Sequence, residues 1–103
     1  MRIRTLENSE ILDLKGLIPK WEIINSSSLS QEFKLSSFRN GLEFVNIVGD
    51  LAEALNHHPD IVLRYSSVTI TLTTHSIKGL SELDVELARR IDNSFQKFSE
   101  LKG

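Results

Sequence analysis

Three histidines are the residues of this chain best suited to proton transfer. His57 and His58 are adjacent and precede Pro59, and His75 follows at the end of the most strand-like segment. Imidazole has an unperturbed pKa of about 6.5, so it can accept or donate a proton near neutral pH. Three imidazoles can also form a catalytic zinc site with an open fourth position. The histidines therefore indicate either an acid–base site or a metal site.

Local spacing favours the acid–base interpretation. Consecutive side chains of an extended segment face opposite ways, so we expect His57 and His58 to point apart. The chain has no cysteine and no His-Glu-x-x-His motif, which argues against a metal site. It also lacks a Gly-x-Ser-x-Gly elbow, and its glycines are isolated from one another, so serine hydrolysis and phosphate-cradling loops fit poorly. We therefore predict histidine acid–base chemistry without a metal.

Two carboxylates stand near the histidines. Glu53 precedes His57 by four residues, at the end of an expected helix, where it could orient a histidine or a ligand. An exposed glutamate on the polar face of the helix is an equal alternative. Asp84 would lie in the first turn of the last helix, where a carboxylate is stabilising without any functional reason. From position alone, both roles of Glu53 remain possible, and Asp84 is interpreted as a structural residue.

The elements that must position these residues change type along the chain. Apolar spacings of three and four predict helices from a cap at Ser9, over residues 37–56, and from residue 81 onward. Alternating patterns predict strands at 21–25, 29–35, 61–65 and 68–74. This order predicts an α+β fold, a four-stranded antiparallel sheet with its helices packed on one face.

The predicted elements also place the histidines. Pro59 cannot continue a helix, so His57 and His58 should follow the end of the second helix. His75 should lie on the threonine side of the last strand or just beyond it. At such loop positions, replacing His57 or His75 by alanine should change stability by no more than about 1 kcal/mol.

Composition limits the possible partners. The 103 residues carry a net charge of -2 and are 40% apolar, as expected of one soluble domain spanning 1–103. The weakly acidic balance argues against binding nucleic acid or anionic membrane. No apolar run approaches the ~20 residues of a membrane span, and the N-terminus lacks the apolar stretch of a signal peptide. We expect a cytoplasmic protein with no membrane or direct nucleic-acid partner.

A set of residues from Glu53 to Asp84 resembles a known family in identity and spacing. The set comprises Glu53-Ala-Leu-Asn-His57-His58-Pro59, Tyr65, Thr73-Thr74-His75, Gly79-Leu80-Ser81 and Asp84. It is similar, without insertion, to the motif of the pterin-4a-carbinolamine dehydratases. The wider resemblance runs from Trp21 to about Ile91, which is most of the chain.

The resemblance implies an activity and a site. Members of the family dehydrate a 4a-hydroxytetrahydropterin to the quinonoid dihydropterin, in tetrahydropterin recycling, and need no metal or other cofactor. By position, the resemblance implies that His57 and His75 are the acid–base pair and that His58 binds and orients the pterin. The family's further pocket positions, which could support the histidines or bind the pterin, fall on Glu53, Thr74 and Asp84. Trp21 matches a tryptophan near the family's site, although a core role is commoner for a buried tryptophan.

The sequence is also compatible with other roles. Animal members also serve as a dimerisation cofactor of a homeodomain transcription factor, bound through their helices, and other pterin or molybdenum-cofactor pathways are further alternatives. The sequence departs from the family at Asn56, where some members carry aspartate, and at Ile61 and Val62, which replace a Trp-Phe pair of the animal enzymes. The resemblance, together with amphipathic helices and open sheet edges, predicts dimers or tetramers.

Overall fold

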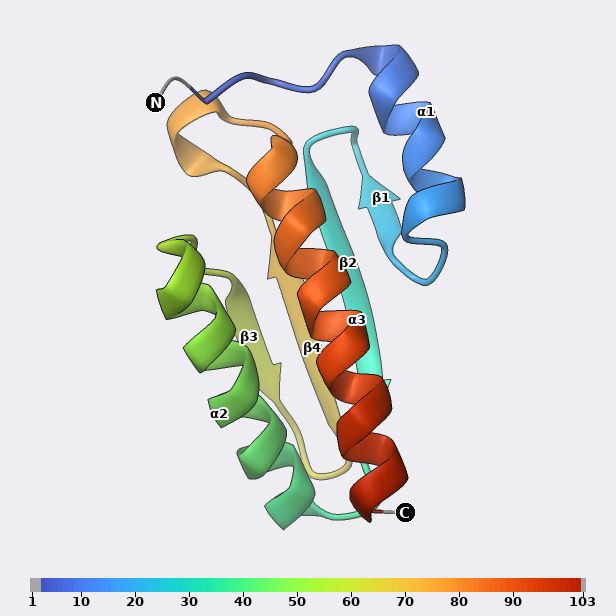
Figure 1. The fold of residues 1–103 in the computed structure, drawn as a ribbon, viewed down its shortest axis with the longest axis vertical. Coiled ribbons are helices and arrows are strands. Elements are labelled where there is room, and N and C mark those ends of the chain that lie inside the picture. The colour runs from blue at the N-terminus through green and yellow to red at the C-terminus, as the bar shows by residue number, and fades with distance from the viewer. Residues whose placement is uncertain (1–2, 103) are drawn as a thin grey trace.

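The described part of the chain contains a four-stranded sheet, three α-helices and one turn of 3₁₀ helix (Figure 1). The computed structural model describes residues 3–102. In chain order its elements are α1 (Asn8–Leu17), β1 (Glu22–Ile24), β2 (Ser28–Lys34), α2 (Phe38–Leu55), β3 (Asp60–Leu63), β4 (Ser67–Leu72), the one-turn 3₁₀ helix η1 (His75–Ile77) and α3 (Glu82–Lys102). The predicted α+β fold is confirmed.

The strands are ordered β1-β2-β4-β3, and every neighbouring pair is antiparallel. Val68, Ile70 and Leu72 of β4 are fully buried, whereas Thr69 and Thr71 between them are half-buried. The predicted alternation of a packed face and a more polar face is therefore confirmed. The apolar face of the sheet is the one that the helices cover.

Helices α2 and α3 lie side by side over the sheet (Figure 1). Phe44 of α2 is fully buried, and its ring lies 5.1 Å from the rings of both Phe33 on β2 and Phe95 on α3. These aromatic contacts join both helices to the sheet in one core.

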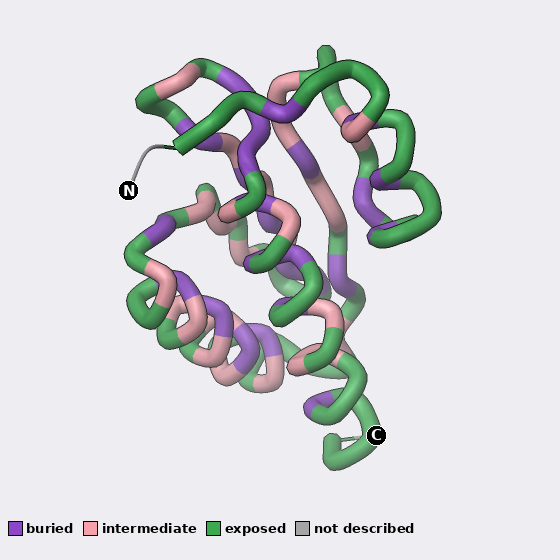
Figure 2. The backbone as a smooth tube through the Cα atoms, turned by 45° about the horizontal axis from the view of Figure 1, so that its top comes forward, coloured by how far each residue is buried: buried purple, intermediate pink, exposed green. Residues whose placement is uncertain are grey.

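Helix α2 buries one side and leaves some apolar residues exposed. Gly41, Phe44, Val48 and Ala52 are its buried residues, and Figure 2 shows the buried positions recurring along one side of the helix. Phe38 and Leu42, which are four residues apart and so lie on one side of the helix, are 43% and 45% exposed. Part of the apolar surface of α2 therefore stays exposed at these two residues.

The helix starts are set by hydrogen-bonding side chains. Ser37 Oγ accepts from the backbone N–H of Asn40 (3.1 Å), as expected for a cap at the predicted start of α2. The prediction that Ser9 caps the first helix is wrong, because Glu7 is the cap and pairs reciprocally with Glu10. Hydrogen bonds from Arg4 and from the Glu7 backbone lower the pKa of Glu10 to about 2. The helix cap therefore lies at Glu7, with Glu10 completing a charged capping box, and not at Ser9 two residues later.

The two glycines of α2 differ in their surroundings and allow a matched test of this packing. A Cβ at Gly41 would lie 2.8 Å from Leu63 Cδ1 of β3, whereas a Cβ at Gly49 would meet nothing within 4 Å. We expect Gly49→Ala to raise the free energy of unfolding by ~0.5–1 kcal/mol, the usual helical advantage of alanine. Gly41→Ala should gain less, because Leu63 must move. Urea unfolding measures both, and an equal gain would contradict the close approach of α2 to β3.

Candidate active site

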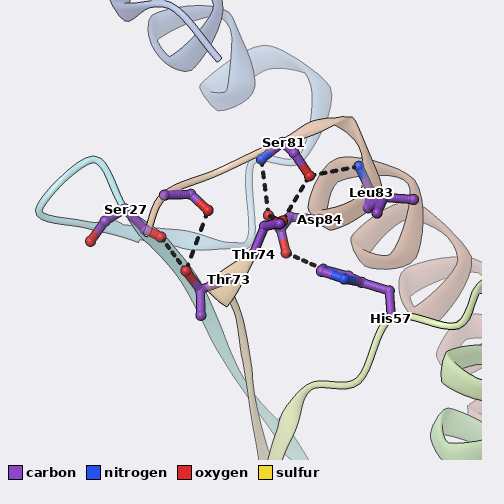
Figure 3. A network of polar contacts seen from close by, with 8 residues as sticks. Ser27, His57, Thr73, Thr74, Ser81, Leu83 and Asp84 are labelled. Atoms are coloured by element: carbon purple, nitrogen blue, oxygen red, sulfur yellow. Dashed lines mark hydrogen bonds and ion pairs between the residues drawn. The ribbon is translucent and has the colours of Figure 1, made fainter. Parts of the chain in front are cut away.

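His57 and Asp84 form a direct contact inside the protein (Figure 3). His57 Nε2 lies 2.6 Å from Asp84 Oδ1, and the two side chains are only 10% and 0% exposed. Asn56, which follows α2, adopts the left-handed conformation (φ 51°, ψ 45°) that asparagine tolerates better than most residues. This turn lets the His57 N–H donate to Ala52 O (3.0 Å) at the end of the helix. The end of α2 thus holds the His57 backbone while its ring contacts the start of α3.

Asp84 accepts hydrogen bonds from three separate segments. Besides His57, its carboxylate accepts from Thr74 Oγ1 (2.7 Å) after β4 and from the backbone N–H of Ser81 (3.0 Å) before α3. The position of Asp84 in the first turn of α3 predicted a structural role, which the Ser81 contact fits. The position of Asp84 in the sequence did not predict its contact with His57, because the two residues are 27 positions apart. The family resemblance indicated only that Asp84 is a pocket position that could support the histidines or bind the pterin.

His58 and Glu53 form a second, exposed pair. His58 Nε2 contacts a carboxylate oxygen of Glu53, and the side chains are 56% and 75% exposed. The prediction that His57 and His58 point apart is confirmed. Glu53 contacts a histidine, but the histidine is His58, not His57, and its side chain is also exposed, as the alternative expected.

His75 lies just beyond β4, as predicted, and is exposed as the first residue of η1. The preceding residue, Thr74, is tied on two sides. Its backbone pairs with that of Gly79, and its hydroxyl donates to Asp84. Among the described residues no hydrogen bond joins His75 to another histidine, but it directly follows Thr74, which belongs to the Asp84 network.

Trp21 belongs to a different cluster. Its indole N–H donates to both carboxylate oxygens of Asp92 (3.1 Å each), and its ring packs edge-on against Phe33. Gln31, which interrupts the apolar face of β2, also donates to Asp92 (2.9 Å). These contacts make Trp21 a core residue, and its place near the substrate stays a prediction.

The N-terminal segment lies against the loop that carries the site, a feature that the sequence did not indicate. The N–H of buried Leu6 donates to Leu80 O (2.8 Å). A Cβ at the neighbouring Gly79 would lie 3.4 Å from Thr5 Cγ2, so the two segments approach closely. The segment therefore fixes the backbone beside Ser81.

No three His, Cys, Asp or Glu side chains in residues 3–102 are grouped so that they could hold a metal ion. None of the described helices combines the length and apolar character needed to cross a membrane.

Comparison with known proteins identifies the family. The family model described as Pterin 4 alpha carbinolamine dehydratase matches residues 4–94. The chain belongs to this family. A Rubrobacter xylanophilus protein named "Putative pterin-4-alpha-carbinolamine dehydratase" is 41% identical over 87 residues, which are 84% of this chain and 81% of that protein. The resemblance predicted from the motif is confirmed.

Solved structures share the fold of this pterin-4a-carbinolamine dehydratase family member. A Brucella melitensis transcriptional coactivator/pterin dehydratase superposes with a TM-score of 0.81 at 30% identity, covering 87% of this chain and 97% of that one. A pterin dehydratase-like RuBisCO assembly factor of the alpha-carboxysome gives a TM-score of 0.61 at 24% identity, covering 72% and 87%. At that identity the likeness extends to the fold alone.

The burial of His57 changes the expected cost of removing it. His57→Ala should lower the free energy of unfolding by about 1–3 kcal/mol, because Asp84 Oδ1 would stay buried without a donor. This value replaces the smaller cost expected for a loop position. His58→Ala, at an exposed site, should change it by no more than about 0.5 kcal/mol. Chemical unfolding of both variants checks the contrast, and equal stabilities would contradict the buried pair.

Proposed function

We propose that this protein is a cytoplasmic enzyme that dehydrates a 4a-hydroxytetrahydropterin to the quinonoid dihydropterin, in tetrahydropterin recycling. The observation that carries the proposal is the buried His57–Asp84 contact, found in a chain of the dehydratase family. Both the reaction and the residues that perform it are assigned on this basis.

The reaction needs two proton transfers and no change of oxidation state. The C4a–O bond breaks, and the leaving oxygen takes a proton to depart as water. A ring nitrogen loses a proton, and the electron pair of its N–H bond forms the new C=N bond. One group must therefore act as acid and another as base near neutral pH, which suits imidazoles.

His57 and His75 are assigned to these two transfers. The Nε2 of His57 faces Asp84, so Nδ1 is the nitrogen left to exchange a proton with the substrate. The Asp84 carboxylate orients the ring and stabilises the imidazolium when His57 holds both protons. Exposed His75 follows Thr74, whose hydroxyl donates to the same carboxylate.

His58 and Glu53 are assigned to binding the pterin. Both side chains are exposed, and Glu53 holds His58 by Nε2, which leaves Nδ1 free for a ligand. Thr74 and Asp84 are assigned to supporting His57, because both are buried and their polar atoms contact each other and the protein. Of the family's pocket positions, the exposed ones thus meet the substrate and the buried ones hold the catalytic ring.

Single histidine variants test these assignments. His57→Ala and His75→Ala should each lower kcat by ~10²- to 10⁴-fold, the usual contribution of a proton-transfer group. His58→Ala should mainly raise KM, because an orienting contact acts in the ground state as well. The assay follows dehydration of synthesised 4a-hydroxytetrahydropterin optically, with melting curves to show that each variant is folded. Full activity of folded His57→Ala would refute its role.

The same assay separates the enzyme from the non-catalytic alternatives. A transcription cofactor or an accessory protein of another pathway has no need to accelerate this reaction. Wild-type protein that gives no acceleration over buffer between about pH 6 and 8 would refute the proposed function. The fold would be unaffected by that result.

We also propose that the chain associates with itself into dimers or tetramers. Phe38 and Leu42 form an exposed apolar surface on α2 that the sheet does not cover. Light scattering should give a multiple of 11.7 kDa, and Leu42→Glu should shift the protein toward a smaller species. The matched control is Leu12→Glu on α1, which is also exposed and should change nothing. An 11.7 kDa species at micromolar concentration would contradict association.

A further inference from the structure

Two buried hydroxyl groups extend the His57–Asp84 contact to the start of α3 (Figure 3). Ser81 Oγ lies 2.7 Å from Thr74 Oγ1, which lies 2.7 Å from Asp84 Oδ2. Ser81 is 1% exposed and Thr74 is 3% exposed, so water contributes little to either hydroxyl. Within residues 3–102 every buried side-chain nitrogen and oxygen has a hydrogen-bond partner. The hydrogen-bond partners of these buried hydroxyls must therefore come from the protein itself.

The donors in this network can be assigned by elimination. The Asp84 carboxylate can only accept, so Thr74 must give its one hydroxyl proton to Oδ2. Thr74 then has no proton left for Ser81, and Ser81 must be the donor between the two hydroxyls. Ser81 Oγ in turn accepts from the backbone N–H of Leu83 (3.3 Å). The hydrogen bonds thus run in one direction, from the first turn of α3 to the carboxylate.

The same reasoning fixes the proton on His57. Asp84 has no proton to give, so the proton of the 2.6 Å contact is carried by His57 Nε2. Ser81 is linked to the Asp84 carboxylate in two ways. Its backbone N–H donates directly to Oδ2, and its hydroxyl donates to Thr74, which donates to Oδ2. With Oδ2 held by two donors, Oδ1 is turned toward the imidazole.

We propose that Ser81 is a positioning residue that acts through Thr74 and Asp84 to keep the proton of neutral His57 on Nε2. Nδ1 is then the nitrogen that faces the reaction. The kinetic part of this inference rests on the proposed dehydratase function. The tautomer part concerns the free protein and stands without it.

Ser81→Ala is the direct test. It removes the donor to Thr74, so the hydrogen bond from Thr74 to Oδ2 is weakened and the carboxylate is held less firmly with Oδ1 toward His57. We expect imidazole ¹⁵N NMR of the free protein to show mainly the Nε2–H tautomer of His57 in the wild type and a measurable share of the Nδ1–H tautomer in the variant. We expect kcat to fall about 5- to 10-fold with KM unchanged, as for one buried hydrogen bond. Ser81→Thr keeps the hydroxyl and should restore both readouts.

Ser37→Ala is the matched control, because Ser37 also uses its hydroxyl at the start of a helix but has no link to His57. Both alanine variants should lose stability, while only Ser81→Ala should change the tautomer and kcat. If Ser81→Ala does not fold, Ser81→Gly carries the same test, since glycine is tolerated at a helix cap. An unchanged His57 tautomer in the folded Ser81 variant would make Ser81 a cap only and overturn the inference. A wild-type protein without dehydratase activity would instead refute the proposed function.

Discussion

The site depends on one buried carboxylate. Taking a carboxylate out of water costs several kcal/mol unless it is fully hydrogen-bonded, so Asp84 must draw donors from its surroundings. It does so from the segment after α2, the segment after β4 and the turn before α3, through His57, Thr74 and Ser81. Three connections that are distant in sequence are therefore held at one end of the sheet (Figure 3). Satisfying this charge also orients the histidine.

Strand β4 places the residues that follow it by the simple alternation of side chains. Side chains alternate along a strand, and Val68, Ile70 and Leu72 face the core. Thr74 continues that parity two residues further and is buried, whereas His75 has the opposite parity and is exposed. The left-handed Lys78 (φ 52°) then closes η1, and Gly79 pairs with Thr74. The end of the strand thus yields one buried support and one exposed histidine.

Periodicity predicted the fold and the local directions of the site residues, but not the long-range contacts. The order of elements, the divergence of the two adjacent histidines and the position of His75 all follow from local rules that the structure obeys. Local rules failed where two local signals competed, as at Ser9 against Glu7. The His57–Asp84 contact joins elements whose approach is set by tertiary packing, so local rules could not indicate it, and the family motif gave Asp84 only as a pocket position.

The two adjacent histidines differ in what a substitution can reveal. His57 shares its carboxylate with the cap of α3, so changing Asp84 alters both the start of that helix and the orientation of the imidazole. A loss of activity in an Asp84 variant therefore cannot by itself be assigned to chemistry. The exposed His58 is free of this link, and its pairing with Glu53 contributes little to stability. Burial thus makes one histidine part of the fold as well as of the site, while exposure leaves its neighbour available to a ligand.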